Sequence, residues 1–187
     1  MAASSGRGVE HIAGCVLLPH RSHRDVRGLF TKVFTGHSLD ENAHPFRIRE
    51  LFWSRSQKGV VRGMHLQVPP HSTSKLVWVS YGRIRDVILD LRTDSATFGG
   101  YLVTELSDTS GAVYVPQGCA HGYEVLSEDA VVNYAQDKDH APSHDTGVTW
   151  NSFGFEWSTG DPILSDRDRA LPQMSQFRSP FTMSNSA

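Results

Sequence analysis

Short runs of β-branched and aromatic residues, separated by clusters of Gly, Pro, Asp and Ser, most strongly limit how this chain folds. Runs of this kind are typical of β-strands joined by turns. The pattern predicts strands at residues 60–66, 76–81, 84–91, 100–106, 112–115, 122–126 and 130–134. Gly82 separates two of these runs. Because glycine tolerates a positive φ, we expect residues 75–91 to form a hairpin.

Helical signals are few by comparison. Residues 38–42 and 165–171 carry N-cap chemistry, and Ser165 is followed three residues later by Asp168, as in a capping box. Seven or more short strands in a domain of this size imply a sandwich or a barrel, because closure removes exposed sheet edges. The sequence therefore predicts an all-β jelly-roll barrel with a few short helices.

The chain has 187 residues, enough to bury a core without disulfides or a structural metal. No repeat or linker interrupts residues 12–170, so we expect one domain over residues 1–187 with loose ends at about 1–8 and 178–187. A net charge of −2 offers no surface for nucleic acid. No apolar run reaches the ~18 residues of a membrane span, and the two cysteines fit a reducing compartment. A cytoplasmic protein that binds neither nucleic acid nor membrane is expected.

The densest group of candidate site residues is Arg62, His65 and Lys75, on or beside predicted strands. Arginine grips phosphate oxygens in a bidentate manner, and a neutral histidine accepts a proton near pH 7. On strands of a small barrel, these side chains can face one anionic ligand in its mouth. On composition alone, a hydrogen-bonded core histidine and two solvated strand ends are the more common outcomes.

A second stretch, residues 116–121, has the Pro-x-Gly-x-x-His form with which many cupins close a corner of the barrel. In metal-binding cupins this histidine joins a His-x-His pair and a Glu. Here His65 and His71 are six residues apart, with Pro69 and Pro70 between them. A metal-dependent cupin oxygenase that uses His65, His71 and His121 is therefore a minor alternative, and His121 can equally anchor a loop.

Taken together, these stretches resemble the dTDP-4-dehydrorhamnose 3,5-epimerase family, cupin-fold enzymes that act on nucleotide sugars. The matching segments, in the family's order, are residues 25–30 (DVRGLF), 59–65 (GVVRGMH), 75–77 (KLV), 82–92 (GRIRDVILDLR), 95–99 (SATFG), 114–122 (YVPQGCAHG) and 164–168 (LSDRD). They fall within residues 12–172. Several motifs in the right order are more specific than any one of them, so the resemblance implies a cupin-type jelly-roll barrel.

The resemblance implies four catalytic residues and neither a cofactor nor a metal. His65 would be the base, Asp168 the carboxylate on its other nitrogen, and Tyr134 the acid on the opposite face of the sugar. Removal of a proton beside a ketone places negative charge on the carbonyl oxygen, and Lys75 would stabilise that enolate. On their own, Tyr134 is also an ordinary β-former and Asp168 an ordinary capping residue.

The substrate would be a nucleotide-linked 4-keto-6-deoxy sugar. The residues implied in binding it are Arg27, Phe30, Glu50, Arg62, His121, His140 and Arg167. The three arginines would contact the diphosphate, and binding of this remote group would orient the weakly acidic C–H. Because the family forms dimers, Arg27 and Phe30 are expected to reach into the site of a partner subunit in a homodimer with shared active sites.

The chain departs from the family pattern at several binding positions. Where the family has Gln-x-Asn-x-Ser-x-Ser, this chain has Glu50 and Phe52 in place of Gln and Asn. Lys32 stands where the family commonly has Glu, and His140 where many members carry an aromatic residue. A carboxylate near a diphosphate repels it unless a cation intervenes. The nucleotide is therefore open between dTDP, GDP and CDP.

The leading hypothesis is an epimerase that inverts C3 and C5 of the keto sugar by metal-free proton abstraction. A 3- or 5-mono-epimerase or a ketoisomerase is the nearest alternative, since proton transfer beside a ketone can end in each of these outcomes. A metal-dependent oxygenase and a non-catalytic sugar-binding barrel come from other classes. A binding protein would have no use for the combination of His65, Asp168, Tyr134 and Lys75.

Overall fold

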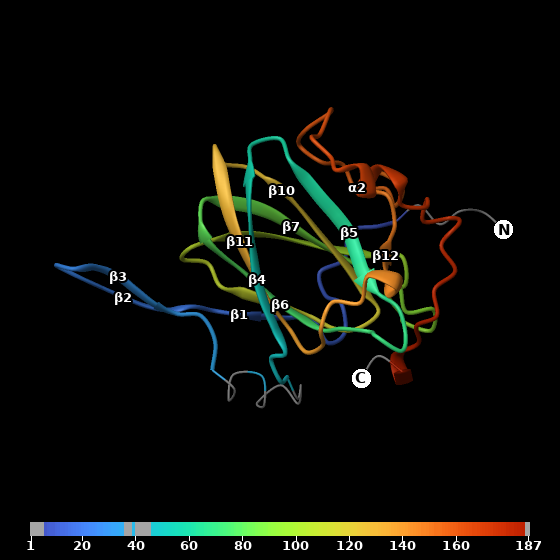
Figure 1. Ribbon diagram of the computed structural model, residues 1–187, viewed down its shortest axis with the longest axis horizontal. Coiled ribbons are helices and arrows are strands. Elements are labelled where there is room, and N and C mark those ends of the chain that lie inside the picture. The colour runs from blue at the N-terminus through green and yellow to red at the C-terminus, as the bar shows by residue number, and fades with distance from the viewer. Residues whose placement is uncertain (1–5, 36–38, 40–45, 186–187) are drawn as a thin grey trace.

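The strands of the molecule form two five-stranded antiparallel sheets and a two-stranded ribbon, as described by a computed structural model covering residues 6–35, 39 and 46–185 (Figure 1). The first sheet has the order β1 (Val16–Leu18), β9 (Ala112–Val115), β6 (Lys75–Tyr81), β11 (Asp129–Gln136) and β4 (Glu50–Gln57). The second has the order β12 (Asp145–Gly147), β5 (Val61–Gln67), β10 (Cys119–Val125), β7 (Arg83–Asp90) and β8 (Tyr101–Ser107). The ribbon consists of β2 (Arg21–Asp25) and β3 (Gly28–Lys32).

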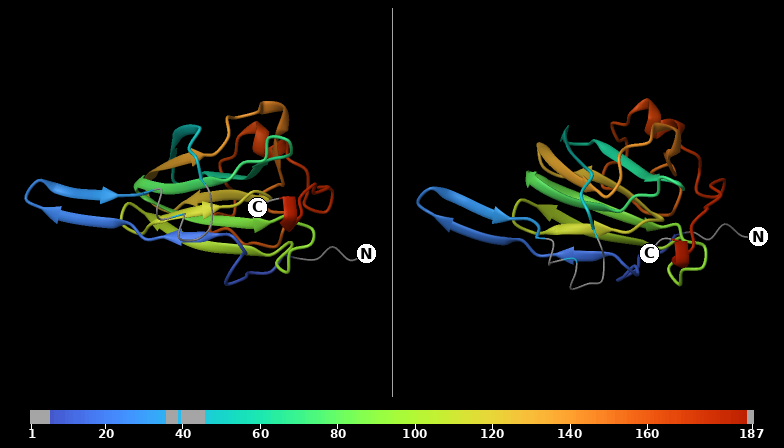
Figure 2. Two further views of the ribbon diagram at one scale, coloured as in Figure 1. Left: turned by 90° about the horizontal axis from the view of Figure 1, so that it is seen from below. Right: turned by 60° about the horizontal axis from the view of Figure 1, so that its bottom comes forward.

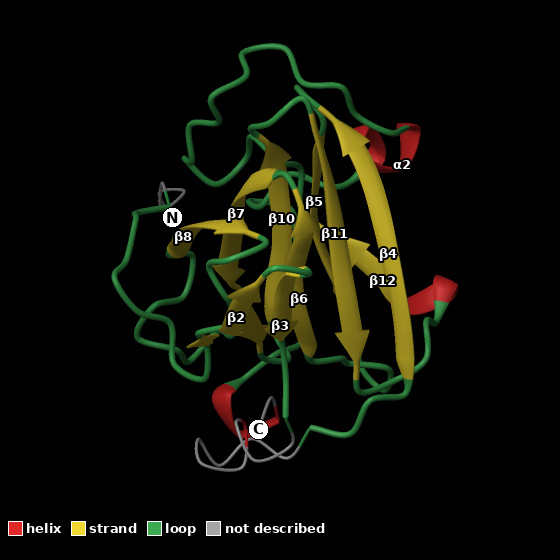
Figure 3. Ribbon diagram, turned by 90° about the vertical axis from the view of Figure 1, so that its left-hand side faces the viewer, coloured by secondary structure: helices red, strands yellow, loops and turns green. Residues whose placement is uncertain are grey.

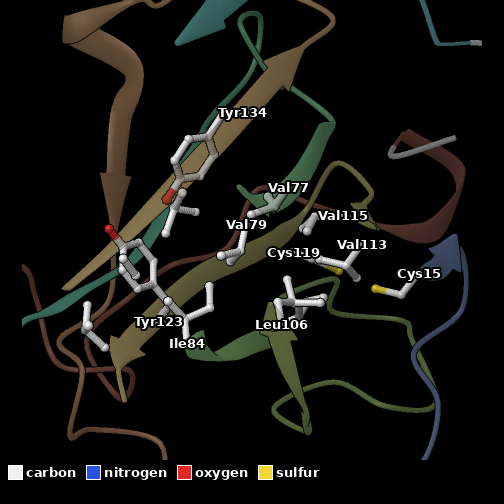
Figure 4. Close-up of a cluster of buried hydrophobic side chains, with 14 of the residues drawn as sticks. Cys15, Val77, Val79, Ile84, Leu106, Val113, Val115, Cys119, Tyr123 and Tyr134 are labelled. Atoms are coloured by element: carbon white, nitrogen blue, oxygen red, sulfur yellow. The ribbon is translucent and has the colours of Figure 1, made fainter. Parts of the chain in front are cut away.

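The main core lies between the two large sheets, because alternate side chains of each strand point inward. Val77 and Val79 from β6 and Val132 from β11 belong to the same fully buried cluster as Ile84 and Ile88 from β7, part of which Figure 4 shows. Seen from the side, strands of the two sheets run in roughly similar directions, with a short helix outside them (Figure 3). The predicted all-β jelly-roll architecture is confirmed.

All seven predicted strands are present, and their ends lie within three residues of the predicted ones. The sequence analysis missed β1, β2, β3, β4 and β12. The ribbon strands are exposed over almost their whole length, and β4 lies at a sheet edge with most of its side chains exposed. Such strands bury no continuous apolar face, so they lack the alternation that reveals a strand.

The predicted hairpin over residues 75–91 is wrong. Gly82 does have a positive φ, of 79°, as expected for the turn. The strands on either side of it do not pair: β6 pairs with β9 and β11, whereas β7 pairs with β8 and β10. The chain therefore crosses from one sheet to the other at Gly82. A turn residue reveals where the chain reverses but not which strand it pairs with.

Helical structure is sparse, as predicted. The α-helix α2 (Asp166–Ala170) begins at the expected N-cap, where the Ser165 hydroxyl accepts a hydrogen bond of 3.1 Å from the backbone N–H of Asp168. The described residues also include two 3₁₀ turns, η1 (Pro142–His144) and η2 (Met183–Asn185). The second predicted helix start, at residues 38–42, lies outside the described residues except for residue 39.

The predicted loose end at residues 178–187 is wrong for residues 178–185. Phe181 is fully buried in a second apolar cluster, and its carbonyl accepts a hydrogen bond from the backbone of Thr93. At the other end, Arg7 and Val9 hydrogen-bond to the backbone of Tyr101 on β8. A single buried aromatic in a polar segment has no periodicity, which is why the sequence did not reveal this anchor.

The β2–β3 ribbon projects away from the two sheets and gives the molecule an arm (Figures 1 and 2). It carries exposed apolar side chains, including Val26 at its tip and Phe30 on β3. Among the described residues, no helix is long and apolar enough to cross a membrane.

Candidate active site

A cavity of about 300 Å³ lies between the two sheets and is lined by polar and aromatic side chains from both. The lining residues are Glu50, Phe52, Ser54, Arg62, His65, Gln67, Lys75, His121, Tyr123, Tyr134, Gln136, His140, Asp145 and Arg167. All four residues proposed for catalysis belong to this cavity or contact it, since Asp168 bonds directly to His65. The cavity therefore brings together residues that are distant in the sequence.

Strand alternation explains most of the lining. Residues two apart on one strand share a face. On the second sheet His65 is followed by Gln67, and His121 by Tyr123, and all four line the cavity. On the first sheet the same spacing orients the cavity residues of β4 and β11.

A bulge between β5 and β10 brings Arg62 and His65 to the same cavity although they are three residues apart. Opposite His121 lies His65, but opposite Tyr123 lies Arg62, so β5 has one residue more than β10 over this stretch. Gly63 adopts a φ of 133° here, and a Cβ atom on it would lie 2.5 Å from the Cα of Gly122. Glycine is required where two backbones approach this closely.

His65 and Asp168 form a short polar contact at the cavity. The Nε2 atom of His65 lies 2.5 Å from Oδ1 of the buried Asp168. Burial lowers the pKa of His65 below its ordinary 6.5, outweighing the hydrogen bond to Asp168. Burial alone would raise the pKa of Asp168, but its hydrogen bonds from His65 and Ser165 lower it. His65 is therefore neutral near pH 7, and its Nδ1 atom is the one left to accept a proton.

Lys75, the first residue of β6, extends across the cavity from the first sheet to the second. Its Nζ atom donates a hydrogen bond of 3.3 Å to the backbone carbonyl of His65. Burial lowers the pKa of Lys75 to about 8, and the charge of Asp145 partly opposes this effect. At pH 7 Lys75 still carries its charge, which places a cation next to the imidazole.

Tyr134 approaches the cavity from β11 on the first sheet, whereas His65 comes from β5 on the second. Its ring stacks on Phe52 of the neighbouring strand, with centroids 4.6 Å apart and planes 10° apart. The His121 ring meets it edge to face at 5.9 Å. Burial raises the pKa of Tyr134 well above its ordinary value near 10. Tyr134 is therefore a protonated phenol, held between two rings.

His121 is held from behind by a buried carboxylate. Its Nε2 atom lies 2.6 Å from Oδ1 of Asp86 on the adjacent strand β7, and both side chains are almost inaccessible to solvent. This bond fixes the orientation of the imidazole ring that faces Tyr134.

The rim of the cavity is a network of charged groups centred on Asp145. The Arg167 guanidinium lies 2.6 Å from Oδ1 of Asp145, and His140 Nε2 lies 2.9 Å from Oδ2. The backbone N–H of His140 donates a hydrogen bond of 2.6 Å to Glu50. This bond ties the loop after β11 to the first residue of β4, so Glu50 and His140 lie side by side at the rim.

Comparison with known sequences shows which family this chain belongs to. The sequence profile of dTDP-4-dehydrorhamnose 3,5-epimerase matches residues 10–176. This chain belongs to the dTDP-4-dehydrorhamnose 3,5-epimerase family. The enzyme of that name from Pseudomonas aeruginosa is 35% identical over 163 residues, covering 84% of this chain and 90% of its own. The resemblance drawn from the motifs is thus confirmed, and with it the cupin-type fold and the assignment to a family of isomerases.

Two solved structures show the fold of this epimerase family and the kinds of epimerase that share it. NovW, a 4-keto-6-deoxy sugar epimerase from the novobiocin biosynthetic gene cluster of Streptomyces spheroides, is 29% identical with a TM-score of 0.89, and the match covers 100% of both chains. ChmJ, a 3′-monoepimerase from Streptomyces bikiniensis solved with dTDP-quinovose, is 27% identical with a TM-score of 0.83. That match covers 90% of this chain and 87% of ChmJ.

Two of the residues implied by resemblance to the epimerase family lie outside the cavity of their own chain. Arg27 and Phe30 are on the projecting ribbon, where Arg27 pairs with Asp25 and both Arg27 and Phe30 are largely exposed. The remaining implied residues, Glu50, Arg62, His121, His140 and Arg167, all line the cavity.

The three histidines of the oxygenase alternative are not assembled at one place. His65 and His121 line the cavity, whereas His71 lines a separate surface pocket and packs 4.4 Å from the ring of His144. In the part of the chain that the structure describes, no group of three or more His, Cys, Asp or Glu side chains is arranged to hold a metal.

The sequence analysis missed several residues of this epimerase cavity, above all Asp145, Tyr123 and Ser54. Tyr123 had a signal, because it follows His121 by two residues on one strand and must share its face. Ser54 is four residues after Glu50, so the two side chains share a face once β4 is recognised as a strand. Asp145 begins the three-residue strand β12, which has no pattern of its own.

Proposed function

We propose that this protein is an epimerase that inverts C3 and C5 of a dTDP-linked 4-keto-6-deoxy sugar. The observation that carries the proposal is the arrangement of a neutral imidazole and a neutral phenol on opposite walls of one cavity. Inversion requires that hydrogen leaves from one face of a carbon and returns to the other. His65 and Tyr134 are suited to these two tasks, because one is ready to accept a proton and the other to donate one.

Each inversion passes through an enolate. His65 takes the proton from the carbon beside the ketone, and Asp168 stabilises the imidazolium that forms. The electron pair moves to the ketone oxygen, where the Lys75 cation stabilises the negative charge. Tyr134 then gives its proton to the opposite face of the carbon. The buried setting strengthens each of these electrostatic contacts.

The cations at the rim support binding of a nucleoside diphosphate. Arg62 and Arg167 line the cavity and can grip phosphate oxygens. Asp145 neutralises Arg167 in the free protein, so a bound diphosphate would replace a carboxylate partner that is already present. The choice of dTDP over GDP or CDP follows the named substrates of the relatives.

We further propose a cytoplasmic homodimer with shared active sites and a single domain per chain. The ribbon supports this, since Phe30 on it is 64% exposed and the ribbon projects away from the two sheets (Figure 2). Val26 and Leu29 are exposed on the same ribbon, and a group of exposed apolar side chains is typical of a surface that a partner covers. Arg27 on the same ribbon would then complete the diphosphate site of the partner subunit.

Shared sites can be tested by complementation. Arg27→Ala and His65→Ala are each expected to inactivate a homodimer, the first through substrate binding and the second through chemistry. In a mixed dimer, one site receives His65 from one subunit and Arg27 from the other, so co-expression should restore about one quarter of wild-type activity. No recovery in a mixture shown to contain mixed dimers would contradict shared sites.

The activity itself is tested by incubating the protein in heavy water with dTDP-, GDP- and CDP-linked 4-keto-6-deoxyhexoses. NMR of the product should locate deuterium at C3 and C5 of the dTDP-linked sugar, with both centres inverted. The reaction without protein serves as the control for spontaneous exchange. If none of the three substrates takes up deuterium faster than this control, the proposed function is wrong.

One observation favours a second candidate, a mono-epimerase. The similarity to ChmJ extends over most of both chains, and ChmJ is a 3′-monoepimerase. In addition, Phe52 stacks on Tyr134 at a position where the family usually has Asn. In the heavy-water experiment a mono-epimerase would invert only one centre of the product.

A further inference from the structure

We propose that Ser54, Tyr123 and Ser56 form a proton relay that reloads Tyr134 while the sugar is still bound. This inference rests on the proposed function, because only an enzyme that inverts two centres of one bound sugar needs its acid twice. After the first inversion Tyr134 is a phenolate, and the second inversion requires a phenol. The proton must therefore reach Tyr134 along the wall of the cavity while the sugar is bound.

The relay is a series of hydroxyl contacts in the cavity wall beside Tyr134. The Ser54 hydroxyl lies 3.0 Å from the hydroxyl of Tyr123, and the Ser56 hydroxyl lies 3.2 Å from the same hydroxyl. Nε of Arg62 donates a hydrogen bond of 3.0 Å to Ser56 Oγ. Ser54 and Ser56 are two residues apart on β4, so both point to the same face as Phe52 and meet the strands that carry the two tyrosines.

The hydrogen bond from Arg62 to Ser56 determines which group donates at each step of the series. Since Ser56 Oγ accepts from Arg62, its own O–H is left to donate to Tyr123. The Tyr123 O–H can then donate to Ser54, and the Ser54 O–H to Tyr134. Figure 4 shows the hydroxyls of Tyr123 and Tyr134 at the same edge of the buried cluster.

The surroundings of Tyr134 explain why a relay is needed. Burial raises the pKa of Tyr134, and the nearby Tyr123 and Asp86 add to this effect, so a phenolate is costly there. The Arg62 charge and a hydrogen bond from Ser54 act in the opposite direction. The two groups that favour the phenolate are thus the two ends of the proposed series. By contrast the His65 side chain is 21% exposed and can return its proton to water directly.

The proton balance closes over each inversion. His65 takes a proton as the C–H bond breaks, and Tyr134 loses its O–H proton as the new C–H bond forms. The phenolate takes a proton from Ser54, Ser54 from Tyr123, Tyr123 from Ser56, and Ser56 from a solvent water at the exposed Arg62 end. The hydroxide left in solvent is neutralised by the proton that His65 releases. One solvent proton enters at Ser56, and His65 releases one.

Tyr123→Phe tests the relay, because it removes the central hydroxyl and leaves the ring and Tyr134 in place. The first inversion should proceed at the wild-type rate, since Tyr134 starts protonated. The second inversion should be slowed, so the ratio of singly to doubly inverted sugar released should rise about tenfold, as expected when a hydrogen bond to a charged group is lost. NMR of the products at low conversion measures this ratio.

Three further variants make the result specific. Tyr81→Phe removes the hydroxyl of an exposed tyrosine on β6 and should leave the product ratio unchanged. Ser54→Ala breaks the same series at a partly exposed position and should raise the ratio as well. The double variant Ser54→Ala with Tyr123→Phe should raise it no further, because both changes interrupt one route.

Two outcomes would overturn the relay while leaving the epimerase intact. In the first, Tyr123→Phe and Ser54→Ala release the wild-type product ratio, or slow both inversions equally. In the second, the wild-type protein inverts one centre only, so no second proton is needed. Absence of any inversion by the wild-type protein would instead contradict the proposed function.

Discussion

Both walls of the cavity enclose their reactive side chain, but the two side chains have opposite acid–base roles in the proposed reaction. On the second sheet, burial lowers the pKa of His65, and on the first it raises the pKa of Tyr134. In both cases the low-dielectric surroundings disfavour the charged form of the side chain. One physical effect therefore prepares an unprotonated base and a protonated acid at the same pH, without any further adjustment of either group.

The walls differ in how each group is held after it has reacted. In the proposed mechanism His65 becomes a cation, and the Asp168 carboxylate beside it is 2.5 Å away. Tyr134 becomes an anion, and around it lie the Phe52 ring and hydroxyl groups linked to Arg62. Each wall thus presents the partner that the reacted form requires. Variants on the His65 wall should consequently affect proton removal. Variants on the Tyr134 wall should affect proton return.

The largest expected effect is that of His65→Ala, which removes the base. Deuterium uptake from heavy water into the keto sugar should fall by roughly 10³-fold, within the range that general base catalysis contributes. His11→Ala, which changes an exposed histidine near the N-terminus, is the matched control and should exchange at the wild-type rate. Normal exchange by His65→Ala would show that the base is another residue.

Tyr134→Phe should distinguish proton removal by His65 from proton return by Tyr134. The base is intact, so deuterium uptake should stay within a few-fold of wild type, while inverted product should fall by roughly 100-fold because the opposite face has lost its proton donor. NMR measures both quantities in one sample. Should exchange and inversion fall together, Tyr134 would not act on the second face alone.

Asp168→Asn should have a smaller effect on the first wall. An amide can still bond to His65 but cannot stabilise the imidazolium by charge, so kcat should fall roughly tenfold. Asp166→Asn, at an exposed position of the same helix, is the control for any effect of helix charge. Wild-type kcat in Asp168→Asn would mean that the pair has no part in proton removal.

The pH profile of kcat/KM should have two limbs, one set by His65 and the other by Lys75. His65 must be neutral, so kcat/KM should decline as the pH falls through its pKa, which lies below 6.5. Lys75 must be charged, so kcat/KM should decline as the pH rises through about 8. Tyr134 adds no limb in this range, since its pKa lies well above 10.

Lys75→Arg provides the check on the upper limb. Arginine keeps its charge at every pH used, so the decline near pH 8 should vanish in this variant even where overall activity is reduced. An upper limb that persists at the same pH in Lys75→Arg would assign it to another group.

What the sequence could predict differs between these regions for a physical reason. His65, Lys75 and Tyr134 lie on strands with clear β patterns, and the family motifs imply the roles proposed for them. Asp168 could be placed because the N-cap Ser165 marks the start of its helix. The fold class was predictable in the same way, since many short strands have few means of closing their edges.

Contacts between distant segments could not be predicted from the sequence. The hairpin prediction at Gly82 failed because local turn chemistry does not specify partners in another sheet. The cluster of Asp145, His140 and Arg167 joins a short strand, a loop and a helix, and no spacing along the chain encodes that meeting. Tyr123 was within reach by alternation from His121, but its bonds to Ser54 and Ser56 depended on finding β4.

The central claim is that hydrogen leaves by one wall and returns from the other, and a single turnover in heavy water tests it most directly. Excess protein is mixed with unlabelled dTDP-linked 4-keto-6-deoxyglucose, and the product is analysed by NMR after one turnover. The account predicts that every inverted carbon carries solvent deuterium. Inverted carbons that retain the substrate's own hydrogen would mean that one group both removes and returns it, and would contradict the account.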